Sequence, residues 1–172
     1  VDRNDNTAIG FEALKLNTAV GNTAVGKAAA DSNTTAEGIT AIGNRALCSN
    51  TTGAHNTAVG LCAMRTSTTG ANNTSMGMCS LFANTTGEQN TAVGVCSLNA
   101  NTTGSRNVAF GRHALDTNVS GNSNTAIGDQ SLFANTASNN TALGFFSMAS
   151  NTSGTGNTGL GQNALTANTT GA

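Results

Sequence analysis

The chain has 172 residues, of which only 9% are charged, and its formal net charge is −1. Pro, Trp and Tyr are absent, and the seven basic and eight acidic residues are scattered singly. This pattern excludes the basic surface on which binding to nucleic acid or to an anionic membrane depends. It also excludes membrane insertion by this segment, because no apolar run reaches the length of about 18 residues that a spanning helix needs.

Ten copies of one repeating unit fill the chain. Each copy contains the phrase Asn-Thr-Ala-apolar-Gly or a close variant, and the closing glycines lie 16 or 17 residues apart. These glycines are Gly10, Gly26, Gly43, Gly60, Gly77, Gly94, Gly111, Gly128, Gly144 and Gly161. A fixed period of this kind is the signature of a repeat fold, so residues 1–172 are predicted to form a single repeat domain without separate caps. The chain begins at Val1 and shows no signal segment, so we expect a processed chain or a segment of a longer array.

The unit reads N-T-A-φ-G-x-x-A-L-x-x-N-T-T-G-x-x, where φ is a large apolar residue, and its positions are numbered here from 1 at the first Asn. In the copy at 90–106, residues 90–93 and 96–99 alternate small and large side chains, as short strands do. Gly94 and the NTTG phrase at 101–104 have the composition of turns. The sequence therefore predicts an all-β fold, a parallel β-solenoid (β-roll) of about ten 17-residue coils, with two short strands and two corners in each coil.

Two columns of large apolar residues are predicted to form the core, because they recur at the same positions in the coils. Position 4 contains Ile9, Val25, Ile42, Val59, Met76, Val93, Phe110, Ile127, Leu143 and Leu160. Position 9 contains Leu14, Leu47, Met64, Leu81, Leu98, Leu115, Leu132, Met148 and Leu165, with Ala30 as the exception. The small residue at position 3 points away from position 4, and we expect it to lie against a second surface such as a neighbouring chain.

The Asn column at position 12 is predicted to form a ladder through the stack. Side-chain amides in register can donate to one neighbouring coil and accept from the other. The ladder residues are Asn33, Asn50, Asn84, Asn101, Asn118, Asn135, Asn151 and Asn168, preceded by Asn17, and Ser67 interrupts the column. We expect this ladder to hold the coils together.

The phrase Asn-Thr-Ala-Val-Gly at 90–94 resembles the N-S-V-A-I-G repeats of trimeric autotransporter adhesin heads, the YadA-like (Hep/Hag-type) family, and so do residues 40–43 and 108–111. The resemblance covers all ten units. It implies a left-handed parallel β-roll, three chains side by side, an extracellular or cell-surface location, and adhesion to a surface receptor or matrix ligand. Similar repeats also occur in phage fibres.

One local group of apolar residues is a candidate assembly site, because contiguous exposed apolar surface marks interfaces. This assembly patch comprises Leu61, Cys62, Met78, Cys79, Val95 and Cys96, which occupy positions 6 and 7 of three successive coils. Its three thiols form a row and cannot all pair with one another, so we expect free thiols, with a cross-chain disulfide as the alternative. We expect no metal ion and no cofactor, because tetrahedral sites need converging ligands.

No catalytic constellation is present in the sequence. His55 and His113 occupy different columns, and Asp116 and Asp129 have no repeated partner. The sequence therefore favours a non-enzymatic structural or adhesive protein, a segment or subunit of an extracellular fibre or filament. We expect a homo-oligomer, either a side-by-side trimer or a head-to-tail filament. A segment of a phage tail fibre is an alternative interpretation with the same architecture.

An ice-binding β-solenoid is a second reading. Thr recurs at position 2 in nine of the ten coils, with Val108 as the exception, and regular Thr columns can order water. Against this reading, position 4 on the same face is assigned to the core. The Thr column at position 14 is also interrupted, at Ala19, Ser120, Ala137 and Ser153.

Overall fold

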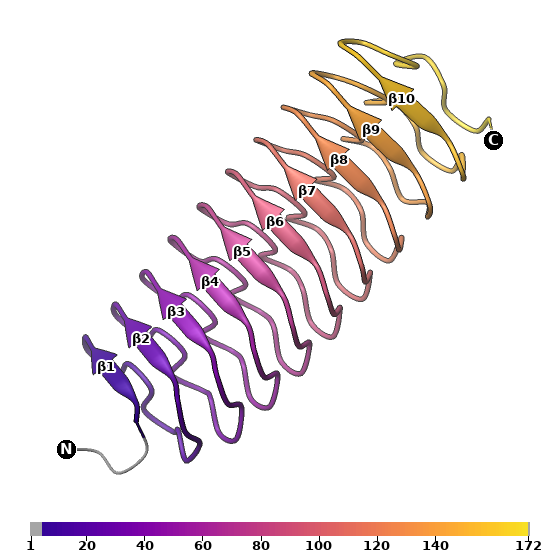
Figure 1. Cartoon of the computed structure of the whole chain (residues 1–172). Helices are drawn as coiled ribbons and strands as arrows, with labels where there is room; N and C mark the ends of the chain where they lie inside the picture. Colours follow the sequence, from indigo (N-terminus) through magenta and orange to yellow (C-terminus); the bar gives the residue numbers. More distant parts are fainter. Residues whose placement is uncertain (1–4, 172) are drawn as a thin grey trace.

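The computed structural model describes residues 5–171, so the first four residues and Ala172 of the predicted domain lie outside the description. Each coil contributes one strand to a ten-stranded sheet, whose strands follow one another in chain order (Figure 1). The strands are β1 Thr7–Ile9, β2 Thr23–Val25, β3 Thr40–Ile42, β4 Thr57–Val59, β5 Thr74–Met76, β6 Thr91–Val93, β7 Val108–Phe110, β8 Thr125–Ile127, β9 Thr141–Leu143 and β10 Thr158–Leu160. No helix occurs between residues 5 and 171. The prediction of a parallel β-solenoid is confirmed.

The register of the sheet places each position of the unit beside its own copies. Thr91 pairs with Val108, Ala92 with Ala109 and Val93 with Phe110, and the other pairs of strands are parallel in the same way. The first and last coils consequently lie at opposite ends of a regular stack (Figure 1). Because every column is continuous along the stack, each column of the sequence becomes a stripe of the structure.

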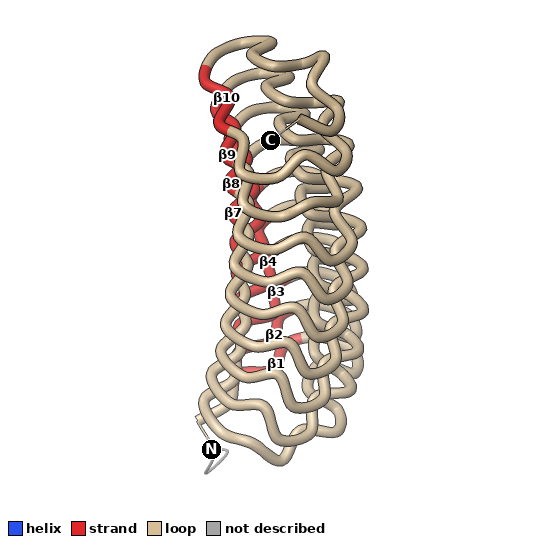
Figure 2. The backbone as a smooth tube through the Cα atoms, turned by 90° about the vertical axis from the view of Figure 1, so that its right-hand side faces the viewer, coloured by secondary structure: helices blue, strands red, loops and turns tan. Residues whose placement is uncertain are grey.

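The second strand predicted in each coil is absent, and this part of the prediction is wrong. Residues 96–99 form a turn, because positions 7 and 9 adopt the left-handed conformation, with φ 55° at Cys96 and 50° at Leu98. Backbone hydrogen bonds between coils nevertheless continue there: Leu98 N donates to Ala114 O at 2.9 Å, and Cys96 N donates to Met78 O at 3.0 Å. The coil thus has one strand wall and one turn wall, and Figure 2 shows the strands confined to one side of the stack.

The corner after each strand requires glycine. Gly94 has φ 131°, and a Cβ there would lie 2.5 Å from the carbonyl oxygen of Gly111 in the next coil. Side chains rarely adopt that backbone conformation, and the stacked backbone leaves no space for one. Position 5 is therefore fixed by both conformation and contact.

The large apolar residues at position 4 are not core, which corrects the prediction for that column. Seven are exposed, namely Ile9, Ile42, Met76, Phe110, Ile127, Leu143 and Leu160, and the other three, Val25, Val59 and Val93, are half-buried. Successive side chains of a strand point to opposite faces, and here the Ala at position 3 takes the inward face.

The interior has room only for a small side chain at position 3. At Gly159, an added Cβ would lie 2.7 Å from Cγ of Met148, a position 9 residue of the preceding coil. The surface that approaches position 3 is therefore the opposite wall of the same solenoid, and the prediction that a neighbouring chain lies there is wrong.

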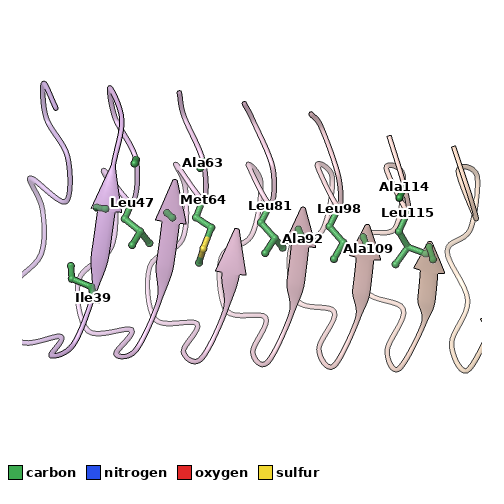
Figure 3. Close-up of a cluster of buried hydrophobic side chains, with 14 of the residues drawn as sticks. Ile39, Leu47, Ala63, Met64, Leu81, Ala92, Leu98, Ala109, Ala114 and Leu115 are labelled. Atoms are coloured by element: carbon green, nitrogen blue, oxygen red, sulfur yellow. The ribbon is translucent and has the colours of Figure 1, made fainter. Parts of the chain in front are cut away.

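Position 9 supplies the large residues of the core. Leu47, Met64, Leu81, Leu98, Leu115, Leu132 and Met148 are fully buried, and Figure 3 shows labelled members of this column following one another through the stack, between the strands and the opposite wall. Leu14 in the first coil is half-buried, and Leu165 in the last coil is 48% exposed. The core thus consists of the position 9 column packed among alanines, with Ile39 at position 1 as one further large buried side chain.

The Asn ladder at position 12 forms between most neighbouring coils. Asn101 Nδ2 donates to Asn84 Oδ1 at 3.0 Å, and Asn118 Nδ2 donates to Asn101 Oδ1 at 3.0 Å. The ladder breaks at Ser67, where Asn50 Oδ1 and Ser67 Oγ are buried without a partner. It breaks again after Asn118, whose Oδ1 also lacks a partner. The next ladder residue, Asn135, lies in a 16-residue coil, where its Nδ2 donates to a carbonyl two residues on, Ala137 O, rather than three.

A second Asn ladder, at position 1, was missed by the sequence reasoning. Asn90 Oδ1 accepts hydrogen bonds from the backbone N of Asn107 at 3.0 Å and from its Nδ2 at 3.2 Å. The two ladders meet at the position 15 carbonyl, since Gly104 O accepts from Asn101 Nδ2 at 2.9 Å and from Asn90 Nδ2 at 2.8 Å. The available signal was that position 1 is Asn in nine of the ten units, with Ile39 as the exception.

Candidate interaction surfaces

The outward side of the sheet is a continuous uncharged stripe. We call this stripe the strand face and define it as the side chains at positions 2 and 4. Its members are Thr7, Ile9, Thr23, Val25, Thr40, Ile42, Thr57, Val59, Thr74, Met76, Thr91, Val93, Val108, Phe110, Thr125, Ile127, Thr141, Leu143, Thr158 and Leu160. A Thr column and an apolar column thus run side by side along the sheet, and the apolar members are exposed or half-buried.

The assembly patch has an exposed half and a half-buried half. Leu61, Met78 and Val95 at position 6 are exposed, whereas the three cysteines at position 7 are half-buried free thiols. The patch is confined to three coils, because position 6 is the polar Asn44 in the coil before it and the charged Arg112 in the coil after it. It is therefore shorter than the strand face, which extends over all ten strands.

Large rings outside the strand face are held by neighbours on the turn wall. Phe82 lies under the guanidinium of Arg65, with 5.7 Å between the Arg65 Cζ atom and the ring centroid, and Phe133 packs edge-on against His113 at 6.3 Å between ring centroids. Phe145 and Phe146 have centroids 4.6 Å apart. Most of these rings contact one another or a cation rather than standing alone on the surface.

The ionisable groups form pairs that the sequence reasoning did not find. His113 Nδ1 and Asp116 Oδ2 are 2.7 Å apart, across positions 7 and 10 of one coil. Arg112 Nε lies 3.1 Å from Asp129 Oδ2, between position 6 of neighbouring coils. Each pair belongs to one place in the stack, so the expectation that Asp116 and Asp129 have no repeated partner is not contradicted. The signal for Arg112 and Asp129 was their shared column in adjacent units.

Three of the cysteines, Cys48, Cys79 and Cys96, have a raised pKa. Burial, followed by the neighbouring Cys62, raises the pKa of the Cys79 thiol, and burial, followed by Cys79 and Asp116, raises the pKa of the Cys96 thiol. Burial and a hydrogen bond with Asp31 raise the pKa of Cys48. Within residues 5–171, no group of three or more His, Cys, Asp and Glu side chains is placed to hold a metal ion.

A hollow of about 320 Å³ opens in the first described coil and is lined by Asn6, Ala8, Ala13, Leu14 and Asn17. None of these lining side chains ionises, so the hollow offers hydrogen bonds and apolar contact only. Across the described residues, no helix has the length and apolar character needed to cross a membrane. Comparisons with protein-family models, with curated proteins and with solved structures give no match.

Proposed function

We propose that this chain is a structural repeat segment of an extracellular fibre or filament, and that its strand face packs against other copies of the same chain. The observation that carries the proposal is the outward position 4 column, which presents a large apolar side chain on every strand. A contiguous apolar stripe of this length marks an interaction surface.

A second copy is the occupant that fits the stripe best. Its own position 4 column repeats with the same coil spacing, so two or three copies side by side place each apolar side chain against a counterpart. The strand face carries no charge that would oppose such contact. The YadA-like resemblance supports a side-by-side trimer, a cell-surface location and an adhesive role, whereas a head-to-tail filament would use the ends of the stack.

The size of the strand face predicts weak association that strengthens with the number of coils. Ten strands spaced about 4.8 Å apart and three residues long at about 3.3 Å each present about 480 Å². A standard stable interface buries about 800 Å² per partner. Lateral contact through this segment alone is therefore expected at high protein concentration and in longer arrays.

The test is sedimentation velocity over a wide concentration range, with two matched variants. Replacing Ile42, Met76, Phe110, Ile127 and Leu143 by Thr is expected to abolish association, because Thr is already the residue of the neighbouring column. Replacing the assembly patch by Ser at Leu61, Met78 and Val95 is expected to leave it intact. A wild-type chain that stays monomeric at every concentration, or a loss of association only in the patch variant, would overturn the proposal.

Ice binding is a second candidate, favoured by one specific observation. The sequence argued against ice binding mainly because the position 4 residues were assigned to the core. In the structure these residues instead face outward beside the Thr column. A regular uncharged array of Thr and aliphatic side chains can order water. A measurement of thermal hysteresis with the Thr91→Lys variant as control tests it: activity that is absent in the wild type, or unchanged in the variant, eliminates this candidate.

A further inference from the structure

Three cysteines stand in one column of the turn wall, and their backbones are locked in register. Cys79 N donates to Leu61 O and Cys96 N donates to Met78 O, both at 3.0 Å. Cys62, Cys79 and Cys96 share the same left-handed backbone conformation, with φ of 55°, 54° and 55°. Residues of equal conformation in hydrogen-bonded coils carry their Cβ atoms in parallel, spaced by about 4.8 Å. We call these three residues the thiol row.

The thiols of the row are half-buried and form no disulfide. Burial is the main reason that the pKa values of Cys79 and Cys96 are raised, and the charge of Arg65 acts in the opposite direction on Cys79. Cys79 and Cys96 therefore carry protons that a strongly bound cation has to displace.

The geometry suits a cation with two ligands in line rather than four around a point. The Cβ atoms of the three cysteines form a row, and no three His, Cys, Asp or Glu side chains within the described chain are placed to hold an ion together. Two metal–thiolate bonds with the length known for zinc, about 2.3 Å each, span about 4.6 Å, close to the spacing of about 4.8 Å between stacked coils. Soft thiolate ligands select soft cations such as Cu(I).

We propose that the thiol row binds one soft monovalent cation, Cu(I) or Ag(I), held in line between the sulfur atoms of two neighbouring coils. The cation forms two metal–sulfur bonds and displaces two thiol protons to solvent. Cys79 is a ligand whether its partner is Cys62 or Cys96, and the third thiol keeps its proton. His113 occupies the next coil of the same column, but the site needs sulfur only.

The experiment uses the reduced chain, titrated with Ag(I) in excess imidazole as a competing ligand and followed by native mass spectrometry and calorimetry. The wild type is expected to retain one Ag(I) ion, and Cys62→Ser, which keeps the Cys79–Cys96 pair, is expected to retain it as well. Cys79→Ser removes the sulfur common to both pairs, so its affinity should fall about 100-fold or more, because the second thiolate no longer lies within bonding reach. Cys48→Ser and His113→Gln are controls that should keep the wild-type affinity.

The measured affinities distinguish binding by two neighbouring thiols of the row from binding by each thiol independently. An affinity of Cys79→Ser equal to that of the wild type, or a loss of affinity in Cys48→Ser, would overturn the proposal, and so would Zn(II) binding as tight as that of Ag(I). If Cys79→Ser does not fold, the double variant Cys62→Ser/Cys96→Ser isolates Cys79 and should show the same loss of affinity. The proposal is independent of fibre assembly, since the binding is measured on the dispersed chain.

Discussion

The columns at positions 4 and 9 have the same apolar composition but opposite environments. Val93 on β6 lies on the outer side of the sheet and is half-buried, whereas Leu98, five residues later in the same coil, is 0% exposed. On the strand wall the alternation of side chains turns position 3 inward and position 4 outward. On the turn wall the left-handed conformation at position 9 turns the large residue inward. Backbone conformation and the narrow interior, rather than apolar character, decide which column is core.

The largest expected effect separates these two columns directly. Leu98→Ala should lower the free energy of unfolding by about 3 kcal/mol, because it leaves a cavity in an interior whose other members are mostly small. Val93→Ala should cost less than about 1 kcal/mol, because the side chain is already partly in water. Urea denaturation followed by circular dichroism measures both, and equal losses would contradict the assignment of walls.

The next effect tests the ladder that joins neighbouring coils. Asn101→Ala removes the donor to Asn84 Oδ1 and one of the donors to Gly104 O, so we expect a loss of about 2 kcal/mol from the buried acceptor left without a partner. Asn99→Ala, a half-buried residue outside both ladders, is the matched control and should change stability by less than about 0.5 kcal/mol. The same denaturation curves give the difference, and similar losses in both variants would argue against the ladder.

A smaller effect of opposite sign is expected where the ladder is broken. Ser67→Asn should stabilise the chain by about 1–2 kcal/mol, because it removes a buried hydroxyl that has no partner and gives Asn50 Oδ1 a hydrogen-bond donor. The Nδ2 of the new amide can donate to Asn50 Oδ1, and its Oδ1 can accept from Asn84 Nδ2. Ser150→Asn makes the same chemical change at an exposed position and should be neutral. A raised midpoint in both variants would show that the gain comes from composition and not from the ladder.

The sequence predicts the repeat period, the parallel stacking, the corner glycines, the position 9 core and one of the two ladders, because each follows from a residue that recurs in the unit and has a single structural role. It does not predict the environment of position 4. An apolar column can lie either in the core or on the surface, and the choice depends on the space opposite position 3. The sequence also does not predict that a turn replaces the second strand, because the left-handed residues at positions 7 and 9 are not glycines. Stacking of the coils holds Leu98 in a conformation that costs an isolated residue about 1–2 kcal/mol. The His113–Asp116 pair depends on that turn geometry.

The smallest expected effect concerns the strand face, and it depends on protein concentration. Val108→Thr restores the repeated residue at position 2 on β7, where the side chain is exposed, so the dispersed chain should change in stability by less than about 0.5 kcal/mol. If copies pack through this face, the same substitution weakens an apolar contact, and the thermal midpoint of the variant should fall below that of the wild type only at high concentration. Thr91→Val, the reverse change in the neighbouring coil, should shift the midpoint upward under the same conditions. If the thermal midpoints of the two variants shift in the same direction, or do not depend on protein concentration, the strand face stays in contact with water.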